Sequence, residues 1–81
     1  MIKMKRVEKK IRHEFFTEVL ANMKTFELRK DEDDIQAGDI LILKEWVGYY
    51  TGAVVEKEVT YVLRDAEQHG LMKGYCIIGF R

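Results

Sequence analysis

One stretch of helical periodicity constrains the fold of this chain more than any other feature. Between Glu14 and Met23 the apolar residues recur at spacings of three and four, the pattern of an amphipathic helix with one buried face. Elsewhere the apolar residues alternate with polar ones or form short runs rich in strand formers, such as Ile40 to Leu43. The sequence therefore predicts one main helix, no second long helix after Lys30, and a chain otherwise built of strands.

Alternation and turn residues divide the rest of the chain into strands. The expected strands are Ile2 to Lys9, Thr25 to Arg29, Ile40 to Trp46, Ala53 to Leu63 and Tyr75 to Phe80. Their links are of hairpin length, which favours antiparallel pairing, because parallel strands need long crossover connections. The predicted fold class is α+β: a small antiparallel β-barrel of about five strands with one main helix.

The same patterns predict the core. Strict alternation from Thr25 to Arg29 places Phe26 and Leu28 on the buried face, with Glu27 on the opposite face. Cys76 lies in an apolar run and is expected to be a buried, inert thiol. The predicted core set is Phe16, Leu20, Phe26, Leu28, Ile40, Ile42, Val59, Tyr61 and Ile77.

Length and composition support a single domain over residues 1–81. A chain of 81 residues buries only about two-thirds of its unfolded surface and forms one core. No apolar run approaches the roughly 20 residues of a membrane-spanning helix, and the start lacks a signal-peptide pattern, so the expected location is cytoplasmic. The one cysteine and the two histidines, His13 and His69, show no metal-ligand spacing. No metal or cofactor is predicted.

Charge is unevenly distributed along the chain. Residues 1–30 hold nine Lys and Arg and four Asp and Glu, a net charge of +5, whereas residues 31–81 hold five and ten, a net charge of −5. A basic surface formed by the first segment would attract a polyanion. The alternative is that neighbouring strands pair opposite charges. The total charge of zero lacks the basic surplus of most polyanion binders.

The segment Asn22–Arg29, with the sequence NMKTFELR, resembles the signature Gly-x-Lys-x-x-Glu-x-Arg of ASCH domains. The chain also resembles the DUF3850 family of bacterial and phage proteins, and that resemblance extends through Gly38–Trp46 to the last strand. This resemblance implies a PUA-like barrel, and such barrels often bind RNA or modified nucleotides in a cleft between helix and sheet. The chain departs from the pattern at Asn22, where the signature has glycine, and at Val7, where the family's first strand carries a histidine.

The signature places three charged side chains at one helix-to-strand junction, where Lys24 follows the helix and Glu27 and Arg29 project from one face of the next strand. Arg29 is suited to grip a phosphate with two hydrogen bonds, and Lys24 to add a point charge. Glu27 is suited to accept a hydrogen bond from a base amino group. The alternative is a structural ion pair between Glu27 and Arg29. Trp46 is expected either to stack a base in the cleft or to cover the edge of the core.

Three functions remain open. The first is an RNA- or nucleotide-binding module. The second is an amidohydrolase for modified nucleosides, because one bacterial ASCH-like group hydrolyses N4-acetylcytidine with a lysine at the position of Lys24 and a threonine at that of Glu27. A carboxylate at Glu27 favours the charged ammonium of Lys24 over the free amine that a base needs, so the sequence favours binding over catalysis. The third is a protein-interaction module of a phage or mobile element. The ligand and the oligomeric state are not predicted.

Overall fold

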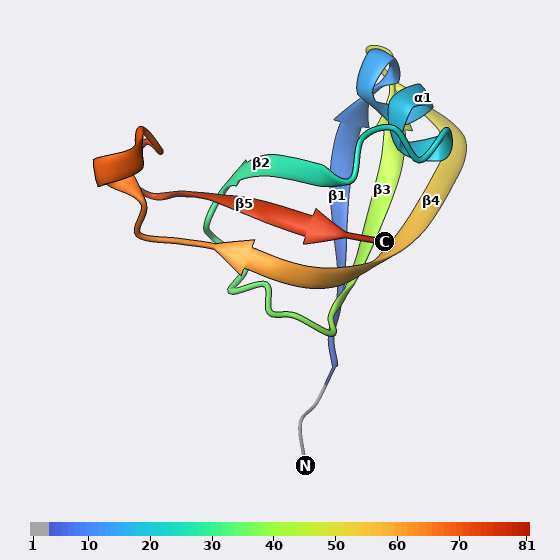
Figure 1. The fold of residues 1–81 in the computed structure, drawn as a ribbon. Helices are drawn as coiled ribbons and strands as arrows, with labels where there is room; N and C mark the ends of the chain where they lie inside the picture. Colours follow the sequence, from blue (N-terminus) through green and yellow to red (C-terminus); the bar gives the residue numbers. More distant parts are fainter. Residues whose placement is uncertain (1–3) are drawn as a thin grey trace.

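The computed structural model describes residues 4–81, and the predicted strand residues Ile2 and Lys3 lie outside that range. Five strands form one sheet in the order β1-β3-β4-β5-β2, with one α-helix after the first strand (Figure 1). The elements are β1 (Arg6–Arg12), α1 (His13–Leu20), β2 (Phe26–Lys30), β3 (Ile40–Trp46), β4 (Tyr50–Leu63), the short 3-10 helix η1 (Glu67–His69) and β5 (Tyr75–Phe80). The predicted five strands and single main helix are confirmed.

The sheet folds over on itself through the long, curved β4. The first half of β4 pairs with β3 and its second half with β5. Figure 1 shows β1 and β3 running along one direction, with β2 and β5 lying across it. The outer strands are β1 and β2, and no strand pairing joins them within residues 4–81. The sheet is therefore not closed, and the predicted barrel is not confirmed.

The strands β1 and β3 pair in parallel, from Arg6 beside Ile40 to Arg12 beside Trp46. The prediction of an entirely antiparallel sheet is wrong for this pair, although the other three pairings are antiparallel. The connection from β1 to β3 contains α1, β2 and the acidic loop that follows. It is long enough to return the chain to the same end of the sheet, as a parallel pair requires.

The helix α1 ends at Leu20, earlier than predicted, and the chain then turns at Asn22. Asn22 has the left-handed conformation expected of it, with φ of 58°, and its amide donates to the Val19 carbonyl at 3.0 Å. Phe16 and Val19 pack into the core, whereas Leu20 is 55% exposed. No helix among the described residues is long and apolar enough to cross a membrane.

In several strands, the side chains that face the core are those on the opposite face from the predicted one. Phe16 and Val59 are buried as expected, while Ile40, Ile42 and Ile77 are partly exposed. The predicted core residues that lie exposed are Leu20, Phe26, Leu28 and Tyr61. The observed buried apolar residues are Ile11, Phe16, Val19, Ile35, Leu41, Leu43, Val59, Ala66, Cys76, Ile78 and Phe80. Because strand side chains alternate with a period of two, choosing the wrong face displaces every residue of a strand. The burial of Cys76 is confirmed.

A β-bulge explains the error in β4. Val59 pairs with Phe80 and Tyr61 pairs with Gly79, so the register shifts between them. Such an unpaired extra residue changes which side of the strand the next residues face. Tyr61 is therefore 65% exposed, although it follows the buried Val59 by two positions.

A buried carboxylate joins the start of β1 to the turn before β3. Asp39 accepts hydrogen bonds from the Lys5 amide at 3.1 Å, from Lys5 Nζ at 2.8 Å and from the Gln36 amide at 2.8 Å. Burial raises the pKa of Asp39, but these hydrogen bonds and the charge of Lys5 outweigh it, so the pKa lies below its ordinary value of 3.8. Asp39 is thus held as a carboxylate at neutral pH.

Candidate functional site

Glu27 is the centre of the site, and it faces inward where the sequence pattern predicts an outward side chain. It is 5% exposed, while its neighbours on β2, Phe26 and Leu28, are 48% and 57% exposed. A buried carboxylate is costly unless cations and hydrogen-bond donors compensate for its lost hydration. The predicted inward face of β2 is therefore wrong, and the burial of Glu27 depends on its partners.

Those partners are the two other residues of the predicted cleft. Lys24 Nζ donates to Oε1 of Glu27, and Arg29 Nε donates to Oε2 at 3.0 Å. Lys24 Nζ also donates to the Phe26 carbonyl at 2.6 Å, and Arg29 Nη2 donates to the Lys10 carbonyl at 2.5 Å. The structure therefore brings Lys24, Glu27 and Arg29 together and links β2 to the end of β1.

Local chain geometry explains why these three side chains meet. The chain reverses after α1 at Asn22, and the amide of Lys24 donates to the Glu18 carbonyl at 3.1 Å. Lys24 is thereby held against the end of the helix, just before β2 begins. Glu27 and Arg29 are two positions apart on a strand and share one face. The helix end and the strand thus direct a lysine and an arginine at the same carboxylate.

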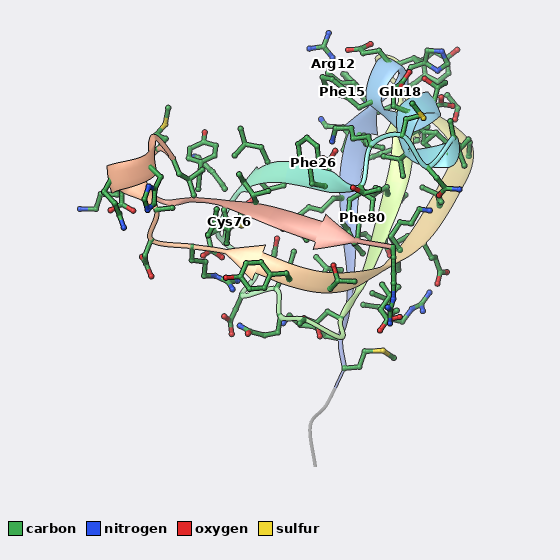
Figure 2. All side chains as sticks on the ribbon, viewed as in Figure 1. Arg12, Phe15, Glu18, Phe26, Cys76 and Phe80 are labelled. Carbon is green, nitrogen blue, oxygen red and sulfur yellow. The ribbon has the colours of Figure 1, made fainter. Side chains whose placement is uncertain are left out.

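Two adjoining hollows open beside these charges, and we call them together the β2 cleft. One has a volume of about 200 Å³ and is lined in part by Lys10, Arg12, Phe15, Glu27, Leu28 and Arg29. The other, of about 260 Å³, is lined by Phe15, Lys24, Phe26, Glu27 and Leu28. Figure 2 shows Arg12 and Phe15 at the helix end of the molecule and Phe26 on β2. The cleft combines cationic and apolar linings.

Aromatic rings lie close to the ammonium of Lys24. Its Nζ is 5.0 Å from the centre of the Phe26 ring and 5.4 Å from that of Phe15. Cations at these distances are attracted to the faces of aromatic rings. The lysine is therefore held by a carboxylate, a carbonyl and two rings together.

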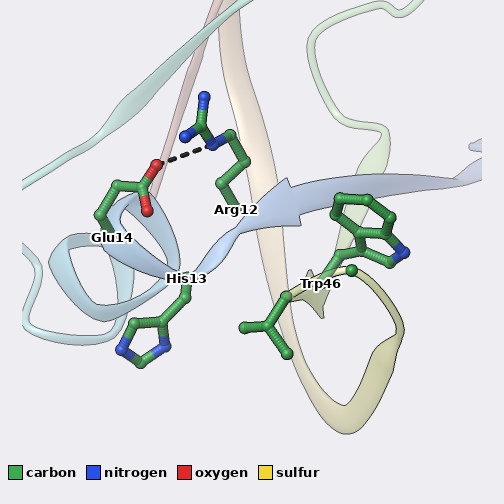
Figure 3. A pocket seen from close by; sticks show the side chains of 6 residues that line it. Arg12, His13, Glu14 and Trp46 are labelled. Carbon is green, nitrogen blue, oxygen red and sulfur yellow. Dashed lines mark ion pairs between the residues drawn. The ribbon is translucent and has the colours of Figure 1, made fainter.

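The structure places Trp46 outside the β2 cleft. It lines a separate hollow of about 260 Å³ with Arg12, His13, Glu14, Val47 and Gly48 (Figure 3). Lys10 Nζ lies 4.3 Å from the centre of the Trp46 ring. Arg12 lines both this hollow and the β2 cleft, so the two regions adjoin through one side chain.

A histidine and a carboxylate pair beside the Trp46 hollow. His13 Nδ1 lies 2.5 Å from Glu45 Oε2, and Thr51 Oγ1 donates to Glu45 Oε1 at 2.7 Å. The hydrogen bonds from His13 and Thr51 lower the pKa of the Glu45 carboxyl. An ionised Glu45 thus orients the His13 ring. Within residues 4–81, no group of three or more His, Cys, Asp or Glu side chains is placed to hold a metal ion.

Opposite charges pair between neighbouring elements, as one of the two interpretations of the charge distribution predicts. The pairs are Lys5–Asp39, Arg6–Glu56, Lys9–Asp33, Lys44–Glu8 and Arg64–Asp31. They engage much of the acidic segment away from the β2 cleft. None of the cations in these pairs lines the β2 cleft.

Sequence reasoning missed Lys10, Arg12 and Phe15 as cleft residues. The first strand was predicted to end at Lys9, but β1 continues to Arg12. The alternation of Lys10, the buried Ile11 and Arg12 was the available signal, because it places the two cations on one face. Phe15 was assigned to the apolar stripe of the helix, although it is 44% exposed.

Comparisons with known proteins place the chain in a family. The family model described as "Domain of unknown function (DUF3850)" matches residues 7–80. The "Uncharacterized 12.9 kDa protein in GpA 3'region" of Escherichia phage P2 is 43% identical over 56 residues. That match covers 68% of this chain and 51% of the phage protein, so the chain spans about half the length of this relative.

Proposed function

The chain belongs to the DUF3850 family, and we propose that it is a binding module for a nucleotide or a segment of RNA, with the β2 cleft as its site. We propose further that its folded-over sheet is related to the PUA-like barrels of ASCH domains. The family description names no function, so the proposal depends on geometry. The observation that carries it is the buried Glu27 carboxylate, which holds Lys24 beside one hollow of the cleft and Arg29 beside the other.

The electrostatics of these three residues favour an anionic ligand. Two cations share one carboxylate, which leaves a formal surplus of one positive charge. Arg29 donates through Nε and Nη2, and within residues 4–81 its Nη1 has no hydrogen-bond partner. A guanidinium with free donors suits the oxygens of a phosphate. Both oxygens of Glu27 accept from cations, so its proposed role is to position them and not to contact a base.

The apolar part of the cleft supports a base beside that phosphate. Phe15 and Phe26 are 44% and 48% exposed and line the same hollow as Lys24. Exposed rings offer a stacking surface that is worth roughly 1–3 kcal/mol for each base. Rings and cations within one cleft match the two halves of a nucleotide.

The contacts of Lys24 favour binding over hydrolysis of modified nucleosides. A lysine that acts as a general base needs an unprotonated amine with a free lone pair. Lys24 Nζ instead donates hydrogen bonds to the Glu27 carboxylate and to the Phe26 carbonyl. These contacts suit an ammonium that anchors a ligand.

A binding titration tests the proposal. Calorimetry or NMR at low salt is expected to detect a nucleoside 5′-monophosphate bound to the wild-type protein. Lys24→Ala and Arg29→Ala should each weaken that binding, and each should reduce its salt dependence because a phosphate contact is lost. Arg6→Ala is the matched control, since Arg6 is an exposed cation of β1 paired with Glu56.

The free energy of unfolding separates a binding site from a structural ion pair. Lys24 and Arg29 both contact Glu27, so each variant needs a denaturation curve beside its titration. A wild-type protein that binds neither nucleotides nor short RNAs, with variants that lose only stability, would overturn the proposal.

A further inference from the structure

We infer that the β2 cleft is one end of a longer track that binds single-stranded nucleic acid over several nucleotides, with Trp46 stacking a base at the other end. This inference rests on the proposed function. It adds the length of the ligand, its path over the surface and a second stacking site.

Neighbouring hollows share lining residues. Phe15 and Glu27 line both hollows of the β2 cleft, and Arg12 lines one of them together with the hollow of Trp46. Figure 3 shows Arg12 and Trp46 on the Trp46 hollow, with Glu14 paired to Arg12. We call these three hollows the Arg12 track. Shared lining residues make the three hollows neighbours, with Arg12 between the β2 cleft and the Trp46 hollow.

The size of the hollows favours an extended ligand. Each has a volume of about 200 to 260 Å³, below the roughly 300–1,000 Å³ of pockets that enclose a small molecule. Each is suited to one base or one phosphate. A row of small hollows therefore fits a chain of repeating units better than one compact molecule.

The lining matches the repeating chemistry of a nucleic-acid strand. Three aromatic residues line the track: Phe15, Phe26 and Trp46. Its four cations are Lys10, Arg12, Lys24 and Arg29. Only Glu14 and Glu27 oppose them, so the track carries a formal charge of +2 in a chain whose net charge is zero.

Rings interleaved with cations favour a single strand over other polyanions. Proteins bind single strands by stacking unpaired bases on aromatic side chains while cations follow the backbone. A duplex keeps its bases stacked inside and cannot offer them to the three rings. An acidic peptide would use the cations and leave the rings without a partner.

Arg12 can exchange its present partner for a phosphate at small cost. Its side chain is 73% exposed and pairs with Glu14, which is 54% exposed, at 2.7 Å. Exposed pairs of this kind contribute only about 0–1 kcal/mol. Arg12 therefore supplies a cation at the junction of the track without a structural role that its replacement would disturb.

Fluorescence of Trp46 tests the inference directly, because it is the only tryptophan of the chain. Single-stranded RNAs of one sequence, from a mononucleotide to a hexanucleotide, are titrated into the wild-type protein. The longer strands should quench Trp46 and bind about tenfold tighter than the mononucleotide, since one further stacked base is worth roughly that much. The mononucleotide should bind without quenching.

Variants then locate the path, with the anisotropy of a labelled hexanucleotide as the readout. Trp46→Leu should weaken hexanucleotide binding at least threefold and leave mononucleotide binding unchanged, because Trp46 lies outside the β2 cleft. Arg12→Ala should weaken hexanucleotide binding at least threefold and also weaken mononucleotide binding, because Arg12 lines the β2 cleft as well. Arg6→Ala, which removes the same charge from the other end of β1, should change neither.

The failures of the two proposals are distinguishable. Longer strands that bind no tighter than the mononucleotide and leave Trp46 unquenched would overturn the track while the β2 cleft stands. Preference for a duplex or for an acidic peptide would also overturn it. Absence of binding by the mononucleotide and every strand would overturn both proposals.

Discussion

The carboxylate of Glu27, buried on β2, accepts a hydrogen bond of 3.0 Å from Nε of Arg29, two residues further along the same strand. The other oxygen of Glu27 binds Lys24. One buried anion therefore sets the positions of two cations before any ligand arrives. Such pre-organisation lowers the entropy cost of binding, because fewer side chains must be ordered when the complex forms.

Removing the charge of Glu27 while keeping its shape should destabilise the protein. Glu27→Gln loses charge-assisted hydrogen bonds to two cations and is expected to cost about 1–3 kcal/mol in the free energy of unfolding. Urea denaturation at neutral pH measures this loss. Glu56→Gln is the control, because Glu56 pairs with Arg6 on the surface, where such pairs contribute about 0–1 kcal/mol. Equal effects of the two substitutions would show that Glu27 is not a structural anchor.

Two neighbouring isoleucines test which face of β5 forms the core. Ile78 is fully buried and Ile77 is partly exposed. Ile78→Ala should cost about 2–5 kcal/mol, as truncations in a packed core do, because it leaves a cavity. Ile77→Ala removes the same atoms and should cost less than half as much. Denaturation curves in which Ile77→Ala is the more damaging change would contradict the observed register.

Periodicity predicted the elements well, because it depends on local sequence. The helix, the acidic loop and the strand Tyr75–Phe80 all lie close to their expected positions. The parallel pairing of β1 with β3 was missed because it depends on where a long connection returns the chain. Local sequence patterns do not show at which end of the sheet a long connection returns the chain.

The faces of the strands were harder to predict than the strands themselves. In β2 the polar–apolar alternation is clear, but the usual rule that apolar side chains are buried selects the wrong face of the strand as the inner one. Glu27 is stabilised inside by Lys24 and Arg29, while Phe26 and Leu28 remain outside and line hollows. In β4 a bulge reverses the pattern between Val59 and Tyr61. The signature residues of the cleft were found because they lie within one short segment, whereas Lys10 and Arg12 join it only through tertiary packing.

Cys76 should react slowly with thiol reagents in the folded protein. Burial raises the pKa of its thiol, and the nearby carboxylate of Asp31 raises it further, so little of the reactive thiolate is present at neutral pH. Alkylation by iodoacetamide, followed by mass spectrometry, should be at least about tenfold slower in buffer than in urea, because labelling requires opening of the structure. Equal rates in the two conditions would place Cys76 at the surface.

Acid should weaken the link between β1 and the turn before β3. The pKa of Asp39 is lowered in the folded protein, so its stabilising contribution is fully present above the ordinary value of 3.8 and is lost as the pH falls through the folded value. Asp39→Asn should lower the free energy of unfolding at neutral pH by about 1–3 kcal/mol, because it removes a charge-assisted acceptor. The difference from the wild-type protein should shrink as the pH falls below that window. A difference that stays constant with pH would exclude this role for the charge of Asp39.

Mapping by NMR of a short single-stranded RNA on the wild-type protein tests the central claim most directly. We expect the largest amide shift changes in Arg12–Phe15, in Phe26–Lys30 and at Trp46, since these segments line the β2 cleft and the Arg12 track. The exposed face around Tyr61, on the second half of β4, should stay unchanged. Shift changes centred on Tyr61, with none in Phe26–Lys30, would contradict the proposed site.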